Sequence, residues 1–594
     1  MVDQIADESA LSDLEQRVVH EVSDEEPWKL LERFSGLERV SGSADEKAAA
    51  EYLTTRLEAL DISYERHDPE LYISQPHDAS VDVVGREFSG DHVKTVSFAA
   101  SGSVTAPIEY VGSAGPSFLD DPDPAERESE PYEDIADLSG TIALTAAGSL
   151  SIRATRKLES KGAEAVIAIH QHEQEPHNGI ATPVWGGVPE LGEQDKIPDV
   201  PIVHVNKPDG EQLREWAEEE DDVVIEVSTD LTTDWFECPV IVGSVEAGSV
   251  NTDEFVLLHA HYDSWHVGIT DNATGDAGLL ELARVLDQYA DELQRNLRIA
   301  WWPGHSTGRY AGSTWYADKF GLEMVRDCVA HINMDSPGTK DATEYTDMSC
   351  WLPETHELVT GAIEDVTDAP SQERLPFRAG DYSFDNLGVT GFFMLSSNIP
   401  ADVREERGYH TVGGCGGNSD AWHLSTDTLD KAGREELVRD IRVYAVSLLR
   451  VLAPDILPFD HRRTVQKLRT TVADYDEAAA DNFDFMPTLY ALDRLSERLE
   501  VFYEELAAGD VAQETANQTI TDLSRTLTRL ILVTEGRFEQ DPAVSRRPVP
   551  RYAPAERFEI LGADESRFLS RQLTREQNAV VYELKQLREQ LPAQ

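Results

Sequence analysis

Histidine and aspartate residues gather behind one apolar run, in the segment LLHAHYDSWHVGITDNATGDAGLLELARVL at residues 257–286. A buried strand is expected to end at Ala260, and His261 and Asp263 follow it two residues apart, on the same side if the strand continues. This spacing lets one side chain bind a metal while the other accepts the spare imidazole N–H. Asp271 opens the turn DNATG just before a helix, where its carboxylate could cap the helix or bridge two metals.

Two later segments supply the same residue types. Asp335 directly follows the apolar run 329–334, where an unpaired buried carboxylate would be costly. His423 precedes Asp427 in a loop that leads to a predicted helix. Histidine nitrogens and carboxylate oxygens are common ligands of zinc. The sequence therefore predicts a zinc centre, with one ion or with two if a carboxylate bridges them, formed by His261, Asp271, Asp335 and His423.

The elements that must position these residues alternate along residues 254–455. Apolar strands are expected at 255–260, 297–302, 329–334 and 391–395. Amphipathic helices are expected near 275–293, 312–319, 354–366 and 431–452. This alternation predicts an α/β fold, with a mixed, mostly parallel sheet that has helices on both faces. Ligand sites of such sheets lie at the carboxyl ends of the strands.

The regions on either side of this alternation have different patterns. Residues 70–235 are rich in short strands, glycines and acidic turns, with a strand–helix–strand pattern at 142–146, 152–161 and 165–169. Long helical patterns dominate after about residue 456. One helix face there is either a core stripe of a helical domain or the seam of a dimer, and it consists of Ala516, Ile520, Leu523, Leu527, Leu530 and Thr534.

The chain of 594 residues is strongly acidic, with 112 Asp and Glu against 51 Lys and Arg and a net charge of −61. This charge excludes a nucleic-acid binder, which needs a basic face, and argues against docking on an anionic membrane. The acid is spread along the chain, and only 12 of the basic residues are Lys. The bias resembles that of proteins from salt-loving archaea, in which molar salt screens the surface repulsion.

The four cysteines and the hydropathy pattern indicate in which cellular compartment the protein works. Cys238, Cys328, Cys350 and Cys415 form no CxxC pair and no disulfide framework. The first residues are acidic and lack the features of a signal peptide. No run of about 18 apolar residues occurs, so we expect no membrane span. We expect a soluble, cytoplasmic protein.

The segments HYDSWHVGITDNATG, HINMD and HLSTDT resemble the metal-binding motifs of the dinuclear zinc aminopeptidase and glutamate carboxypeptidase family. The HxDSW form resembles the glutamate carboxypeptidase and transferrin-receptor-like branch. Residues 140–169 and 197–216 resemble the protease-associated domain that this branch inserts into its peptidase domain, and residues 456–594 resemble its dimerisation domain. The resemblance implies a zinc exopeptidase-like domain at 12–69 and 236–455, a β-rich protease-associated insert at 70–235 and a helical domain at 456–594.

The resemblance also implies roles for the site residues. His261 and Asp335 would hold one zinc, His423 would help to hold the second, and Asp271 would bridge them. Asp263 would orient the imidazole of the first histidine. A rival for the last ligand is His410 in GYHTVGG, although the spacing H-x3-D-T favours the histidine at 423.

One departure from the family pattern concerns the catalytic acid. The family carries a Glu-Glu pair after the strand that corresponds to 297–302, and its first Glu is the general base and its second a zinc ligand. Here the segment is WWPGHSTGRYAGSTWYADKF, with no acid between Leu297 and Ala317, and its nearest counterpart is His305-Ser306. His305 could replace the carboxylate as ligand or base, or be a plain loop histidine in a degenerate site.

These observations favour a zinc-dependent aminopeptidase or exopeptidase that acts on short peptides or acylated amino acids and forms a homodimer through its C-terminal helices. The alternatives are a non-catalytic, receptor-like homologue and a metal-dependent amidohydrolase that cleaves non-peptide amides. Arg309 and Tyr310 could meet a substrate carboxylate or carbonyl. A second possible metal cluster lies in the segment IHQHEQEPH, although surface histidines in contact with solvent are expected at its positions His170, His172 and His177.

Overall fold

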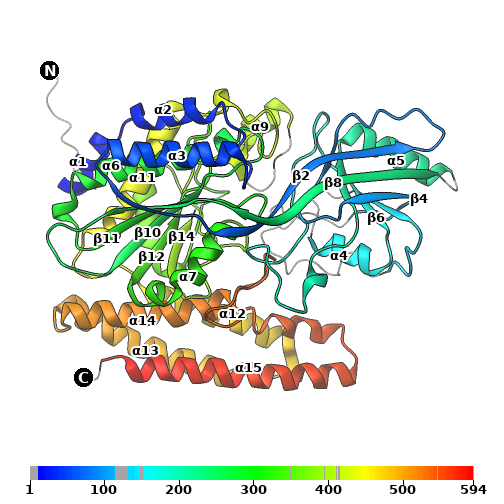
Figure 1. The fold of residues 1–594 in the computed structure, drawn as a ribbon. Helices are drawn as coiled ribbons and strands as arrows, with labels where there is room; N and C mark the ends of the chain where they lie inside the picture. Colours follow the sequence, from blue (N-terminus) through cyan, green and yellow to red (C-terminus); the bar gives the residue numbers. More distant parts are fainter. Residues whose placement is uncertain are drawn as a thin grey trace.

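The structure, a computed structural model, describes residues 11–592 apart from 114–131, 133, 147–151, 221–222, 348, 394, 410, 412–414 and 545. The described chain has a central α/β lobe, a second β-rich lobe beside it and a layer of long helices beneath the central lobe (Figure 1). None of the helices in the described residues is long and apolar enough to span a membrane.

The central sheet has seven strands in the order β1-β9-β11-β10-β12-β14-β13. Its four inner strands β11, β10, β12 and β14 run parallel, and β1, β9 and β13 pair antiparallel at its edges. The predicted mixed sheet is thus confirmed, with its parallel strands side by side. The strands span Ser63–His67 (β1), Val240–Val245 (β9), Phe255–His261 (β10), Asn296–Trp302 (β11), Cys328–Asn333 (β12), Cys350–Trp351 (β13) and Thr390–Phe393 (β14).

Every residue of β10 and β12 is buried, as expected for parallel strands that helices cover on both faces. Successive side chains point to opposite faces, so Val256 and Leu258 pack with one set of helices while Phe255 and Leu257 pack with α7. The first set lies above the sheet in Figure 1 and comprises α2 (Glu25–Phe34), α3 (Ala44–Ala59), α6 (Thr274–Asp287) and α11 (Arg434–Leu452). The opposite face is covered by α7 (Ala311–Asp327).

The helix predicted near 312–319 is longer than expected, because α7 continues as an amphipathic helix to Asp327. The helix predicted near 275–293 is shorter and ends at Asp287. The helix predicted near 354–366 is present as α8 (His356–Thr367). The short edge strands β1 and β13 were not predicted, since two to five residues give too little pattern.

The second lobe contains another seven-stranded sheet, in the order β2-β8-β4-β5-β6-β7-β3. Two long antiparallel strands, β2 and β8, lead into and out of it (Figure 1). The predicted strand–helix–strand pattern appears as β5, α4 (Ile152–Ser160) and β6, followed by α5 (Lys207–Glu219). The strands span Glu70–Val83 (β2), Val93–Thr95 (β3), Gly102–Tyr110 (β4), Ile142–Thr145 (β5), Ala165–Ile169 (β6), Ile202–Val205 (β7) and Val224–Glu237 (β8).

The C-terminal helices settle the role of the apolar helix face at 516–534. Its members Ala516, Ile520, Leu523, Leu527 and Leu530 are at most 1% exposed within one chain, so this face is a core stripe and not a dimer seam. Thr534 lies beyond the end of its helix and donates its hydroxyl to Asp541. The helices span His461–Ala479 (α12), Met486–Ala508 (α13), Gln513–Leu532 (α14) and Ala563–Gln590 (α15).

Candidate metal centre

The candidate site lies at the carboxyl edge of the central sheet, where parallel sheets position ligands. His261 is the last residue of β10, Asp335 follows β12 by two residues, and His305 follows β11 by three. Because β10 pairs with both β11 and β12, these three side chains come from neighbouring strand ends. One ligand atom from each of them lies within 4.8 Å of the others.

Asp271 lies between two imidazoles. Its Oδ1 atom is 3.1 Å from Nε2 of His261, and its Oδ2 atom is 3.2 Å from Nε2 of His423. Each carboxylate oxygen thus faces a different histidine, which is the arrangement of a carboxylate that bridges two metal positions. Asp335 lies on the side of the first histidine, with Oδ2 3.8 Å from its Nε2.

A second aspartate holds the turn that carries this bridging side chain. The carboxylate of Asp427 accepts hydrogen bonds from the backbone N–H groups of Thr270 and Asp271, at 3.0 and 3.1 Å, and from the Thr270 hydroxyl at 2.9 Å. Burial raises the pKa of Asp427 to about 7. The sequence HLSTDT therefore contributes a positioning carboxylate as well as a histidine.

The ring of His423 is fixed from both sides. It stacks on Trp422, with ring centroids 3.6 Å apart, and its Nδ1 lies 3.0 Å from the carbonyl oxygen of Asn178 in the second lobe. Donation from Nδ1 to this carbonyl leaves Nε2 as the free acceptor that faces Asp271. The rival histidine, His410, lies outside the described residues.

Asp263 supports two parts of the site. Its carbonyl oxygen is 3.1 Å from Nδ1 of His261, whereas its carboxylate is 3.6 Å from that nitrogen, so the backbone makes the closer contact. The carboxylate accepts the backbone N–H groups of His305 at 3.0 Å and of Ser306 at 2.9 Å. Asp263 thereby fixes the loop in which the family's Glu-Glu pair is missing.

His305 has a carboxylate partner that the sequence analysis missed. Its Nδ1 is 2.7 Å from Oδ2 of Asp381, a fully buried residue whose other oxygen accepts the Ser313 hydroxyl at 2.6 Å. The ring also stacks on that of His261, with centroids 3.7 Å apart. Asp381 lies 76 positions along the chain from His305. Its only sequence signal is its position just before the two aromatic residues of DYSF.

The charges of the site favour a cation. Burial disfavours the charged form of His261, yet the surrounding carboxylates, chiefly those of Asp263 and Asp271, hold its pKa well above the ordinary value. Burial also opposes the charged form of Asp271, but the two imidazoles hold the pKa of that carboxyl well below its usual range. Buried carboxylates that face imidazole nitrogens suit zinc. The residues present therefore fit the predicted metal.

Arg309 and Tyr310 are both buried rather than open to a substrate. The guanidinium of Arg309 is 3.1 Å from the carbonyl oxygen of Ala543. Tyr310 is 3% exposed and its ring lies edge-on to that of His305, with centroids 4.9 Å apart. A contact of Arg309 or Tyr310 with a substrate stays a prediction.

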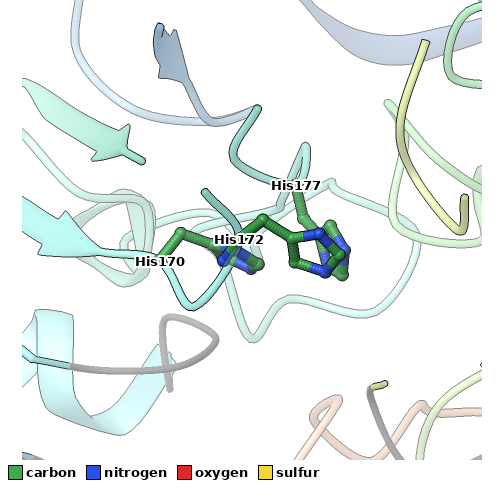
Figure 2. A group of neighbouring side chains, drawn as sticks. All are labelled: His170, His172 and His177. Carbon is green, nitrogen blue, oxygen red and sulfur yellow. The ribbon is translucent and has the colours of Figure 1, made fainter. Parts of the chain in front are cut away.

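The expectation of solvated surface histidines at 170–177 is wrong for two of the three. His170 and His177 are 3% and 4% exposed, and Figure 2 shows their rings beside that of His172. The polar residues around these histidines are typical of a surface loop. In the structure, however, the loop packs against the central lobe, where His177 contacts Trp422.

Part of this chain is similar in sequence to known peptidases. Residues 241–445 match the sequence model of Peptidase family M28. The chain is 26% identical over 308 residues to Aminopeptidase YwaD of Bacillus subtilis, covering 51% of this chain and 58% of that protein. It is 23% identical over 280 residues to the Probable glutamate carboxypeptidase LAMP1 of Arabidopsis thaliana, covering 43% of this chain and 38% of that protein. The chain thus spans less than two thirds of the length of either relative.

A solved structure shares the fold. The aminopeptidase from Aneurinibacillus sp. strain AM-1 superposes with a TM-score of 0.54 at 19% identity, over 74% of this chain and 96% of that one. The likeness agrees with the mixed sheet and its helical layers. The likeness shows the fold, and the match of residues 241–445 to the model of Peptidase family M28 falls in the central lobe.

Proposed function

We propose that the chain is a zinc-dependent exopeptidase of the aminopeptidase type. The observation that carries the proposal is the carboxylate of Asp271, which faces His261 at 3.1 Å and His423 at 3.2 Å. Aminopeptidase YwaD and the Aneurinibacillus aminopeptidase, which this chain resembles, support the same reading. When bound, zinc supplies Lewis-acid activation of a water molecule and of the scissile carbonyl.

We assign each ligand to a metal position according to the side of the Asp271 carboxylate on which it lies. In this proposal His261 and Asp335 would hold one ion, His423 would help to hold a second, and Asp271 would contact both. His305 stands on the side of the first ion, because its ring stacks on that of His261.

His305 is the proton acceptor in this proposal. Asp381 holds its Nδ1 at 2.7 Å, which fixes the ring and leaves Nε2 to take a proton from water and return it to the leaving amine. The side chains of His305 and His423 are 14% and 13% exposed, against 0% for His261. A substrate therefore approaches from the side on which these two rings meet solvent.

Several wider features belong to the same proposal. The second lobe would act as a protease-associated insert that limits substrates to short peptides or acylated amino acids. A homodimer through the C-terminal helices would use side chains other than the buried stripe, and exposed Tyr490, Phe568 and Tyr582 on α13 and α15 are available. The free, buried cysteines Cys238, Cys328 and Cys350 suit a cytoplasmic site, and the charge of −61 suits a salt-rich one.

The test is hydrolysis of a panel of aminoacyl-anilides and short peptides by the full-length protein in molar salt, before and after chelation and with zinc restored. We expect activity that chelator removes and zinc restores. Chelator-sensitive cleavage of the anilides without cleavage of any peptide would indicate an amidohydrolase instead. A protein without bound zinc and without activity on any substrate would indicate the non-catalytic homologue.

A further inference from the structure

Three histidines outside the candidate metal centre form a compact group in the second lobe. They lie on the segment that leaves β6, where His170 is the first residue after the strand (Figure 2). The ring of His177 has its centroid 4.3 Å from that of His170 and 4.6 Å from that of His172. One ring nitrogen from each histidine lies within 4.8 Å of the other two. One ion could therefore contact all three rings.

The ring nitrogens of this group lack the partners that burial demands. Among the described residues, Nε2 of His170 and Nδ1 of His177 are buried and have no hydrogen-bond partner. The other nitrogen of His170 has a long contact of 3.3 Å with the backbone N–H of His172. A buried polar group without a partner lowers the stability of the folded state. Two such nitrogens in one cluster are explained if a ligand occupies the space between the rings.

The protonation state of the group suits a metal. Burial and the neighbouring imidazoles hold the pKa values of His170 and His177 well below the ordinary value. Burial also lowers the pKa of the adjacent His204 to about 4. These imidazoles are therefore neutral at pH 7, which is the form that binds metals. A site made of imidazoles alone favours zinc, copper, nickel or cobalt over magnesium or calcium.

The loop that carries the three histidines is bound to the loop of His423. Asn178 accepts a hydrogen bond from His423 at 3.0 Å, and Glu175 accepts the Ser425 hydroxyl at 2.7 Å. Lys94 completes the contact with an ion pair to Glu175 at 2.6 Å. The two clusters share no residue. A metal in the second lobe would nevertheless stiffen the segment that orients the last ligand of the first centre.

We propose that His170, His172 and His177 bind one transition-metal ion of the Zn²⁺ class, at a site separate from the candidate metal centre. The ion takes three imidazole nitrogens and keeps a fourth position for water or a small ligand. It ties the loop at 170–178 to the edge of β6 and so supports the contact with His423. The site does not depend on the proposed peptidase activity.

The test is metal stoichiometry of the full-length protein after equilibration with Zn²⁺ or Co²⁺ in molar salt. We compare wild type with His172→Asn, which alters the most exposed member of the cluster, and with His92→Asn, an exposed histidine of the same lobe, as the matched control. We expect His172→Asn to bind one equivalent less than wild type and His92→Asn to bind the same number. Equal stoichiometry in all three proteins would overturn the proposal.

A second measurement needs no variant. Wild-type crystals grown with Zn²⁺ should show an anomalous scattering peak at the zinc edge among the three imidazoles. Crystals with a peak at Asp271 but none at His177 would also overturn the proposal, while leaving the proposed peptidase function intact. Conversely, a peak at His177 in a protein without hydrolytic activity would support this site and contradict the proposed function.

Discussion

The pair formed by His305 and Asp381 gives the sharpest prediction for the altered loop. The substitution Asp381→Asn keeps the size of a fully buried side chain but removes the negative charge that faces the imidazole Nδ1 at 2.7 Å. If this carboxylate orients the proton acceptor and stabilises its charged form, the loss falls on the chemical step. Binding of substrate should change little.

The magnitude follows from the type of contact. A hydrogen bond to a charged group contributes about 1.5–3 kcal/mol. At about 1.4 kcal/mol for each factor of ten, kcat should fall by roughly 10- to 150-fold. Ser313→Ala is the matched control, because it removes the hydrogen bond to the other oxygen of Asp381 and leaves the contact with His305. We expect the control to retain kcat within about threefold: the bond that it removes is also made to the charged carboxylate and contributes about 1.5–3 kcal/mol, but it does not touch the imidazole.

The assay is steady-state hydrolysis of an aminoacyl-anilide by zinc-loaded protein, with metal content measured on the same samples. A lower kcat with unchanged metal content and KM supports His305 as proton acceptor. Loss of a metal equivalent in Asp381→Asn would assign His305 to the metal as a ligand instead. A kcat within twofold of wild type, or an equal loss in Ser313→Ala, would refute the role given to this pair.

Three further predictions concern stability. Burial raises the pKa of Asp385 to about 7, so the folded state keeps a proton that the unfolded chain releases near pH 4, and the free energy of unfolding falls as pH rises between these values. In urea unfolding, the stability of Asp385→Asn relative to wild type should therefore rise by up to about 4 kcal/mol across this pH range. A stability difference that does not depend on pH would contradict this prediction. The net charge of −61 predicts a lower melting temperature in 0.1 M KCl than in 2 M KCl, because dilution lengthens the Debye length from about 2–3 Å to about 10 Å and the surface carboxylates then repel one another. An unchanged melting temperature would refute adaptation to salt. Leu527→Ala in the buried stripe should cost about 2–5 kcal/mol of unfolding free energy at any protein concentration, whereas an effect that vanishes on dilution would point to a dimer seam.

Much of the central sheet could be predicted, because its strands are continuous apolar runs separated by amphipathic helices. The apolar runs of β10, β11 and β12 were recognisable, and so was the position of His261 and Asp335 at the ends of two of these strands. Parallel strands bring their carboxyl ends to one edge. The closeness of His261 and Asp335 at that edge thus follows from the order of the strands in the sheet and not from their spacing in the sequence.

Other contacts of the site could not be predicted, because they join loops that are far apart in the sequence and have no regular hydrophobic pattern. Asp381 lies in a loop and reaches His305 only through the packing of that loop against α7. Asn178 meets His423 across 245 positions. The burial of His177 likewise depends on Trp422, which no local pattern could indicate.

The central claim is that Asp271 joins two imidazoles around bound metal, and metal analysis of Asp271→Asn tests it most directly. The account predicts that this variant binds at least one zinc equivalent less than wild type and loses nearly all aminoacyl-anilide hydrolysis, while Asp253→Asn, an exposed aspartate before β10, matches wild type in both. An Asp271→Asn protein that keeps its zinc and its activity would contradict the account.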